Sequence, residues 1–313
     1  MTLALVFPGQ GAQSAGFLHR LPEHEAVRAT LDEASATLGI DVTTLDSADA
    51  LRSTVAVQVA LTVAGVAIAR ALASEGLDAG FHAGLSVGAY PAAVSCGAVA
   101  FDDALRMVRR RAELMEAAWP SGYGLAAISG LNETQIETLA GAHAQDSSER
   151  VYVANVNAPR QIVVTGTDAA LDAFAARALE AGARRAMRLA VTVPSHCRLL
   201  DDAADQLVAW AKDIPFHTPH GVYVDNRGGR PLRSGDAIRE DLATNMRDTV
   251  RWFDALTLMV EAGATVFVEA PPGEVLTDIT REHYPDVTAL AASTLPPDRL
   301  AAIVKRRLGD LCA

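Results

Sequence analysis

The first part of the chain alternates between short apolar runs and longer stretches whose apolar residues recur with helical spacing. Two apolar runs predict buried strands, Leu3–Phe7 and Gly80–Ala83. Four stretches predict helices: His24–Leu38, Val55–Ala73, Tyr90–Gly97 and Phe101–Trp119. Strands that alternate with helices in this way are typical of a parallel sheet covered by helices.

The pattern changes after Leu125, where six elements follow in the order strand, helix, strand, strand, helix, strand. This βαββαβ order is typical of a ferredoxin-like module. Asn132 and Thr167 stand where helix N-caps belong, and Gly182 stands where a helix ends. The segment His143–Glu149 is expected to be a surface loop. The predicted elements are Leu125–Ser129, Glu133–His143, Val151–Val156, Gln161–Gly166, Ala169–Ala181 and Arg185–Leu189.

The α/β rhythm returns after Val193-Pro194. We therefore predict an α/β fold in which residues 1–123 and 193–313 form a large subdomain with a parallel sheet. Residues 124–192 form a small subdomain inserted into it. The last predicted elements are helix Arg198–Ala211, strand Val222–Val224, helices Ile238–Arg247 and Trp252–Ala262, strand Thr265–Glu269 and a helix from Pro297.

Composition and charge narrow the class of protein. The 313 residues are 50% hydrophobic, which is enough for a large core, and the net charge of −11 argues against nucleic acid or an anionic membrane as main partner. The apolar stretch Val55–Ala73 contains Gln58 and Arg70, so we interpret it as a buried helix. Three cysteines form no disulfide framework and suggest no metal site, which favours a reducing, cytoplasmic location.

Gly84-Leu85-Ser86-Val87-Gly88 lies between a strand signal and a helix signal, which is the context of a nucleophile elbow. Such a turn exposes the serine Oγ and points a helix N-terminus at the reacting carbonyl. The glycines make the turn possible because side chains there would collide with the strand and the helix. The alternative is a chance match in a chain rich in glycine and alanine.

Serine chemistry also needs a base, and eight histidines are available. His196 stands out because it follows Val193-Pro194-Ser195, where the small subdomain returns to the large one, and clefts form at such junctions. A surface or capping histidine is the competing interpretation. Cys197, beside it, is interpreted as a structural residue rather than a thiol nucleophile.

Two further segments are candidates for binding the acyl group. Gln10 lies in a glycine-rich turn directly after the first strand, so its N–H could join that of Val87 in an oxyanion hole, although an ordinary βα turn would look the same. Arg109-Arg110-Arg111 lies within a predicted helix, where at most one or two of the three can face a pocket. An inward arginine would bind a carboxylate and so imply an acyl chain that ends in a free acid.

Together these segments resemble the malonyl-CoA:acyl-carrier-protein transacylase family, in the right order over nearly the whole chain. The resemblance implies an α/β-hydrolase-like large subdomain, a ferredoxin-like small one and an acyl site between them. It also implies a malonyl-CoA substrate, no cofactor of the protein's own, and a histidine oriented by backbone carbonyls. The matching segments are Phe7–Gln13 (FPGQGxQ), the helix with Gln58, Gly84–Gly88, Arg111–Met115 (RGxxM), Asn155–Val163 (NxNxPxQIV) and Val193–Cys197.

By this resemblance Ser86 is the nucleophile and His196 the base, while Arg111 holds the malonyl carboxylate. The stretch Thr244–Trp252 matches the segment that orients the histidine, and we expect the carbonyl of Asp248 to do so here. The other matching site residues are Met115, Gln58, Asn155 and Asn157 for the substrate, and Asn245 where the family usually has glutamine.

The elbow departs from the family's GHSxGE because Leu85 replaces histidine and Ala89 replaces glutamate. In this it resembles the epsilon subunit of malonate decarboxylase, which implies transfer of malonyl to a dedicated carrier subunit and contact with other subunits of that enzyme. The alternative is a transacylase of fatty-acid or polyketide synthesis. Two further alternatives are a serine hydrolase that uses Asp168 or Asp172, and a non-catalytic subunit that docks a carrier protein.

Overall fold

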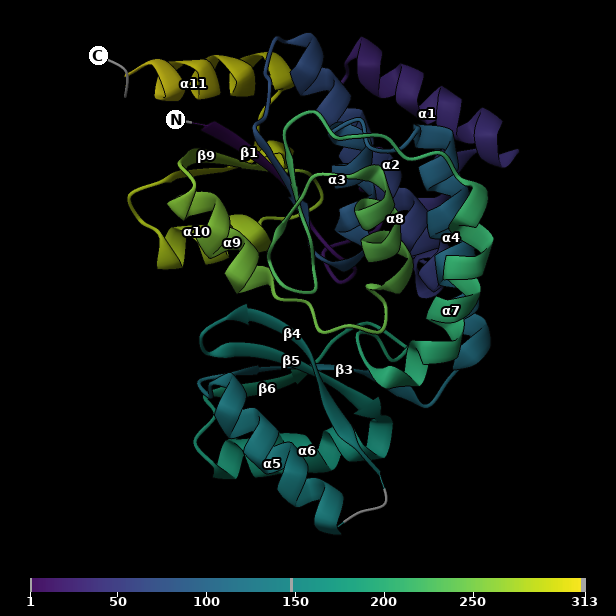
Figure 1. Ribbon diagram of the computed structural model, residues 1–313, viewed down its shortest axis with the longest axis vertical. Coiled ribbons are helices and arrows are strands. Elements are labelled where there is room, and N and C mark those ends of the chain that lie inside the picture. Colours follow the sequence, from purple (N-terminus) through teal and green to yellow (C-terminus); the bar gives the residue numbers. More distant parts are fainter. Residues whose placement is uncertain (1, 147–148, 311–313) are drawn as a thin grey trace.

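The computed structural model describes residues 2–146 and 149–310, which form two sheets with their helices (Figure 1). The larger sheet has the strand order β10-β9-β1-β2-β7-β8. The first five strands are parallel, and β8 runs antiparallel to β7 at one edge. Its strands are β1 (Thr2–Phe7), β2 (Phe81–Gly84), β7 (Val222–Val224), β8 (Pro231–Leu232), β9 (Ala264–Glu269) and β10 (Thr288–Ala291).

Helices cover both faces of this sheet, as its alternating side chains require. On β1, Leu3 and Leu5 pack into one hydrophobic cluster with α1, α2, α4 and α11, while Ala4 and Val6 pack into a second cluster with α9 and α10. The helices are α1 (Glu25–Leu38), α2 (Thr54–Ser74), α3 (Ala89–Ser95), α4 (Phe101–Ala118), α7 (Asp201–Trp210), α8 (Gly235–Thr244), α9 (Trp252–Glu261), α10 (Val275–His283) and α11 (Pro297–Asp310).

Helix α2 is hydrophobic on all sides, and it lies in the centre of the core. By length and composition alone it could cross a membrane, yet 89% of its most apolar window is buried inside the protein. Core helices of soluble proteins have the same character. The interpretation of residues 55–73 as a buried helix is therefore confirmed, with the Ser53 hydroxyl capping its first turn.

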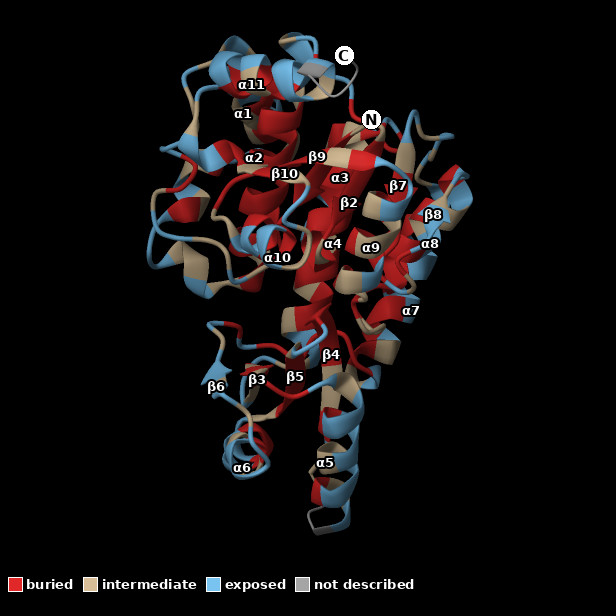
Figure 2. Cartoon of the chain, turned by 90° about the vertical axis from the view of Figure 1, so that its left-hand side faces the viewer, coloured by how far each residue is buried: buried red, intermediate tan, exposed pale blue. Residues whose placement is uncertain are grey.

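The smaller sheet is antiparallel, with the order β4-β5-β3-β6, and carries two helices on one face (Figures 1 and 2). This is the predicted ferredoxin-like arrangement. Asn132 and Thr167 accept hydrogen bonds from the first turns of its helices, as predicted. The exact subdomain boundaries stay a prediction. The elements are β3 (Tyr123–Ser129), α5 (Glu133–Asp146), β4 (Val151–Ala158), β5 (Gln161–Thr167), α6 (Asp168–Glu180) and β6 (Arg185–Arg188).

The small sheet is joined to the large subdomain through its edge strand, β4. Its residues Ala154 and Val156 exchange backbone hydrogen bonds with Val250, at 2.9 and 2.8 Å, in the segment before α9. The Thr249 hydroxyl adds a bond to the Val153 carbonyl, at 2.9 Å. The β4 edge of the small sheet is therefore hydrogen-bonded to the large subdomain.

Two predictions about elements are corrected. Residues 143–149 are not a loop from their first residue, because α5 continues to Asp146 and buries His143 against the ring of Phe174 on α6; residues 147 and 148 lie outside the described residues. Helix α10 and strands β8 and β10 were not predicted. They are short, and α10 follows a proline pair that reads as a loop.

Candidate active site

Ser86 lies at the sharp turn between β2 and α3, and its backbone is left-handed with φ of 56°. The flanking glycines are required by space. A Cβ on Gly84 would lie 1.9 Å from the backbone of Gly88, and one on Gly88 would lie 2.2 Å from the Phe7 carbonyl oxygen. The predicted strand–turn–helix context of the elbow is thus present, and the turn packs directly on the end of β1.

His196 meets Ser86 across the turn. Its Nε2 lies 2.7 Å from Ser86 Oγ, and its Nδ1 lies 2.7 Å from the carbonyl oxygen of Asn245 and 3.1 Å from that of Asp248. The carbonyls can only accept, so Nδ1 carries the proton and Nε2 is left to accept from the serine hydroxyl. The prediction named Asp248 alone; both carbonyls are placed to orient the ring, and that of Asn245 is closer.

Burial, together with the positive charge of Arg111, lowers the pKa of His196 to about 4. The imidazole is therefore neutral near pH 7, which is the form that can take a proton from Ser86. His196 itself has a left-handed backbone, with φ of 61°, and its N–H donates to the Met246 carbonyl at 2.7 Å. Both reacting side chains thus stand on strained backbone that the surrounding structure must hold.

Arg111 is the one arginine of its run that turns inward. Its side chain is fully buried, and the guanidinium donates to Gln58 Oε1 at 2.6 Å, Asn245 Oδ1 at 3.2 Å and Ser86 Oγ at 3.3 Å. Burial lowers its pKa. In contrast, Arg109 and Arg110 pair with Glu113 at the surface.

Among the described residues, no carboxylate lies within ion-pair distance of Arg111, and its Nε has no hydrogen-bond partner. A buried guanidinium that is surrounded only by neutral groups keeps an unmet preference for an anion. Because Arg111 contacts Ser86 Oγ, an anion that binds to the guanidinium would lie next to the Ser86 hydroxyl.

A cavity of about 80 Å³ opens at Ser86 between the two sheets. Asn157, on β4, is buried there with its Oδ1 unpartnered. Gln58 lines the cavity and also contacts two other predicted site residues, because its Nε2 lies 3.5 Å from both Gln10 Oε1 and Met115 Sδ. Arg111 and Met115 lie behind the lining. The lining residues are Gln10, Gln58, Leu85, Ser86, Leu125, Asn155, Asn157, Val163, Leu189, Val191, Ser195 and His196.

The predicted oxyanion donors lie on neighbouring loops. Gln10 follows β1 and Val87 follows β2, and these strands pair in parallel so that Phe7 is level with Gly84. Within residues 2–146 and 149–310, neither backbone N–H has a hydrogen-bond partner. Two free amides at adjacent strand ends, next to a serine, are what an oxyanion hole requires.

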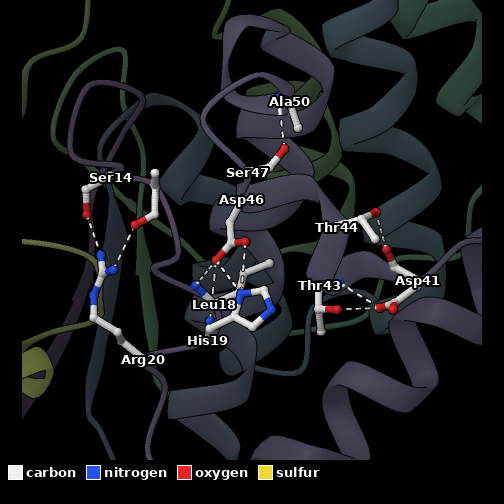
Figure 3. A network of polar contacts seen from close by, with 11 residues as sticks. Ser14, Leu18, His19, Arg20, Asp41, Thr43, Thr44, Asp46, Ser47 and Ala50 are labelled. Carbon is white, nitrogen blue, oxygen red and sulfur yellow. Dashed lines mark hydrogen bonds and ion pairs between the residues drawn. The ribbon is translucent and has the colours of Figure 1, made fainter.

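The loop that carries Gln10 is anchored farther along by Asp46 (Figure 3). This buried carboxylate accepts the N–H of Leu18 at 2.7 Å and lies 3.0 Å from His19 Nδ1. The Asp46 carbonyl also accepts the N–H of Gly16 at 2.9 Å. These bonds fix the long connection between β1 and α1 and so limit the movement of the glycine-rich turn.

Other candidates lie outside the site. Asp168 and Asp172 lie on α6 and pair with Arg188 at the surface, so they are not placed to orient His196. Burial raises the pKa of Cys197 to about 12, which leaves its thiol protonated and unsuited to nucleophilic attack. Cys312 lies outside the described residues. No group of three histidine, cysteine or acidic side chains suited to a metal occurs in the described part of the chain.

Sequence reasoning missed the apolar lining residues Leu125, Val163, Leu189 and Val191, and it missed a polar residue that binds the nucleophile's backbone. Asn226 follows β7, and its Oδ1 accepts the backbone N–H of Ser86 at 2.8 Å. The only available signal was a pair of polar residues, Asp225 and Asn226, directly after a predicted strand.

Comparison with known proteins agrees with this geometry. Malonyl CoA-acyl carrier protein transacylases are 36% identical in Escherichia coli K12, over 96% of this chain and 98% of that protein, and 38% identical in Haemophilus influenzae, over 93% and 95%. The structure of the transacylase from Coxiella burnetii superposes with a TM-score of 0.92 at 32% identity, over 98% of both chains. A malonyl-transacylase in complex with the acyl-carrier protein of a type II PKS gives 0.90 at 34%, over 96% of this chain and 99% of that one. The model of the acyl transferase domain family matches residues 4–310, and the chain therefore belongs to that family.

Proposed function

We propose that the protein is a malonyl-CoA:acyl-carrier-protein S-malonyltransferase that works through a malonyl-serine intermediate. The observation that carries the proposal is the position of Arg111. This buried cation has no acidic partner, and it donates a hydrogen bond to Ser86 Oγ at 3.3 Å. An acyl group with a free carboxylate supplies the missing anion. The names of the relatives, which are malonyl transacylases, support the same substrate.

The reaction would proceed in two half-reactions. His196 Nε2 takes the Ser86 proton while Oγ attacks the thioester carbonyl, and the N–H groups of Gln10 and Val87 stabilise the oxyanion. The tetrahedral intermediate collapses, CoA leaves with the proton from His196, and malonyl stays on Ser86 as an ester. In the second half-reaction His196 deprotonates the carrier thiol, which attacks the ester and regenerates Ser86.

Mass spectrometry after incubation with malonyl-CoA tests the proposal. We expect a mass increase of one malonyl group on the peptide that contains Ser86, which is lost on addition of a carrier protein with its prosthetic thiol. A non-catalytic docking subunit would show no label. A serine hydrolase would lose the label to water at the same rate without carrier.

Arg111→Ala tests the choice of acyl group. Loss of a buried charge that binds the carboxylate should lower malonyl transfer by about 10²-fold and leave acetyl transfer equal or faster. Arg109→Ala, in the same helix but at the surface, is the matched control. Equal losses of malonyl and acetyl transfer would show that Arg111 supports the fold rather than the carboxylate.

Two candidate carrier proteins could accept the malonyl group. The relatives favour the acyl carrier protein of fatty-acid or polyketide synthesis, and one solved relative holds a type II PKS carrier. Leu85 and Ala89 favour the carrier subunit of malonate decarboxylase, and Leu85 lines the cavity. Transfer rates to the two carriers from malonyl-labelled protein would decide between them. A cytoplasmic location stays a prediction.

A further inference from the structure

The left-handed backbone of Ser86 is held by hydrogen bonds within the elbow and by one to its N–H from outside the elbow. For a residue with a side chain this conformation is strained, and it persists only where surrounding contacts enforce it. Within the elbow, the Gly88 N–H donates to the Leu85 carbonyl at 3.0 Å, which closes the turn but does not bind the Ser86 amide. The Ser86 amide is bound by Asn226, whose Oδ1 accepts its N–H at 2.8 Å, while the Ser86 carbonyl lies at a longer 3.5 Å from Asn245 Nδ2.

Asn226 is itself fixed on both sides. It is 3% exposed, its carbonyl accepts the N–H of Arg251 at 2.7 Å, and its own N–H lies 3.4 Å from Asp241 Oδ1. Asp241, on α8, also accepts the Tyr223 hydroxyl at 2.6 Å. A chain of buried polar contacts therefore runs from Ser86 through Asn226 to α8 and β7.

The strand order explains why this residue is in reach. Strand β7 is the parallel neighbour of β2, so the residues after both strands emerge at the same edge of the sheet. The elbow follows β2 and Asn226 follows β7 within two residues. The contact thus joins residues 140 positions apart in the chain.

Only half of the Asn226 amide is used. Its Oδ1 binds Ser86, whereas its Nδ2 has no partner although it is buried. An amide kept for fold stability alone would gain from pairing both groups. The used half is bonded to the nucleophile's own backbone, and Asn226 is not among the residues that line the cavity.

We propose that Asn226 is a positioning residue for the nucleophile. Its Oδ1 holds the Ser86 amide in the left-handed conformation, and this keeps Ser86 Oγ within 2.7 Å of His196 Nε2. The same bond occupies the Ser86 N–H, so the amides of Gln10 and Val87 remain as the oxyanion donors. The inference rests on the proposed role of Ser86 as nucleophile, but it concerns the reactivity of the hydroxyl and not the acyl group.

The test therefore uses a reagent that needs no malonyl group. Phenylmethylsulfonyl fluoride reacts with an activated serine when Oγ attacks sulfur, fluoride leaves and His196 takes the proton. We expect Asn226→Ala to lower the labelling rate of Ser86 by about 10²-fold, because a small misplacement of reacting atoms has effects of that size. The KM for malonyl-CoA should stay within about twofold while kcat falls, since Asn226 does not line the cavity.

Asn226→Asp separates the acceptor from the rest of the side chain. It keeps an oxygen where Oδ1 stands and replaces only the unpartnered Nδ2, so it should label at least about tenfold faster than Asn226→Ala at pH 6. Asn132→Ala, which removes the cap of α5 in the small subdomain, is the control for lost stability. It should label Ser86 at the wild-type rate. Should the alanine variant not fold, Asn226→Ser, with a side chain too short to reach the amide, replaces it.

The proposal is overturned if folded Asn226→Ala labels Ser86 at the wild-type rate. It is also overturned if Asn226→Asp is as slow as Asn226→Ala, or if Asn132→Ala is equally slow. Failure of the proposed function would look different: wild-type protein would react with the sulfonyl fluoride at Ser86 but take no malonyl group from malonyl-CoA.

Discussion

Two serine–histidine pairs lie in the large subdomain, and they share the features usually sought in a catalytic pair. His196 Nε2 lies 2.7 Å from Ser86 Oγ, and His82 Nδ1 lies 3.0 Å from Ser95 Oγ. The other nitrogen of each ring faces a backbone carbonyl. Burial lowers the pKa of both histidines to about 4. Neither the hydrogen bond nor the shifted pKa distinguishes the two pairs.

The pairs differ in backbone conformation. Ser86 and His196 are the non-glycine residues with left-handed φ in the described chain, whereas Ser95 ends helix α3. Ser86 stands beside the unpaired amides of Gln10 and Val87 at the ends of two neighbouring strands. Strain at both reacting residues is therefore a better indicator of function here than the contact between them.

The pairs also differ in charge and in space. The arginine beside the Ser86 pair has no acidic partner, whereas Arg70, which lines the cavity beside Ser95, is paired with Glu33 at 2.6 Å. The cavity at Ser95 is the larger, about 300 Å³ against 80 Å³. Cavity size would thus select the Ser95 pair, whereas the unpaired buried cation selects the pair that we propose as catalytic.

Removal of the two serine hydroxyls should give the largest contrast. We expect Ser86→Ala to lower malonyl transfer by at least about 10³-fold, because only binding and oxyanion stabilisation remain. Ser95→Ala should stay within about twofold of wild type, since it touches no reacting atom. The rate of transfer from malonyl-CoA to a carrier protein measures both. Similar losses in the two variants would remove the distinction between the pairs.

The histidines should differ by a smaller factor. His196→Gln removes the base and should lower transfer by about 10²- to 10⁴-fold, the usual range for general acid–base catalysis. His82→Gln should transfer malonyl at close to the wild-type rate per folded molecule. Rates are to be compared after thermal unfolding has shown the folded fraction of each. A large loss in folded His82→Gln would mean that His82 affects the reaction at Ser86.

The pH dependence of acylation should report His196 and not His82. A base acts only when neutral, so kcat/KM is expected to be flat down to about pH 5 and to fall as the pH passes through about 4. Arg111→Met removes a positive charge that lowers this pKa, so its acid limb should move to higher pH, measured with acetyl-CoA. His82→Gln should leave the limb unmoved. An acid limb near pH 6.5 in the wild type would contradict the burial argument.

Stability should show the smallest effect, and here the two histidines act alike. Each has a folded pKa of about 4 and an unfolded value of 6.5, so the unfolded state binds more protons between these values and stability falls as pH drops. His82→Gln should reduce the loss between pH 7 and pH 5 by about 2 kcal/mol. Urea unfolding at the two pH values measures it; an unchanged loss would show that His82 is not protonated on unfolding.

Asp241 opposes this trend. Burial raises its pKa from 3.8 to about 7, so its contribution to stability is present below its unfolded pKa and is lost as pH rises through about 7. The pH dependence of the whole protein is therefore shallower than the histidines alone would give. The His82→Gln comparison avoids this complication because Asp241 is the same in both proteins.

The sequence was informative where chemistry forces a residue type. Glycines around Ser86 are dictated by contacts under 3 Å, so the elbow could be recognised from five letters and its flanking elements. Helix geometry alone could not say which of the three arginines turns inward, whereas the family resemblance pointed to Arg111, which the structure buries. The structure places the predicted site residues around one cavity, while their individual roles stay predictions.

The sequence was silent where a contact depends on strand order. Nothing in the pattern says that the strand before Asn226 lies next to the strand before Ser86, so their bond could not be foreseen. The choice between the carbonyls of Asn245 and Asp248 depends on their distances to His196 Nδ1, which are 2.7 and 3.1 Å. His143 looked like a loop residue because its burial comes from α6, which is distant in sequence.

The central helix α2 has a consequence for how the protein is made. Its apolar residues leave the ribosome long before strand β9 and helix α11 do. Strand β9 pairs with β1, and α11 packs into the same hydrophobic cluster as α2. At the usual speed of synthesis this interval lasts roughly 10–50 seconds. During this time the hydrophobic core that buries α2 is incomplete, although α2 is as apolar as a membrane-spanning helix. We therefore expect early packing against α1 and α4 to protect this helix until the last strands are made, and we expect truncations before residue 264 to aggregate.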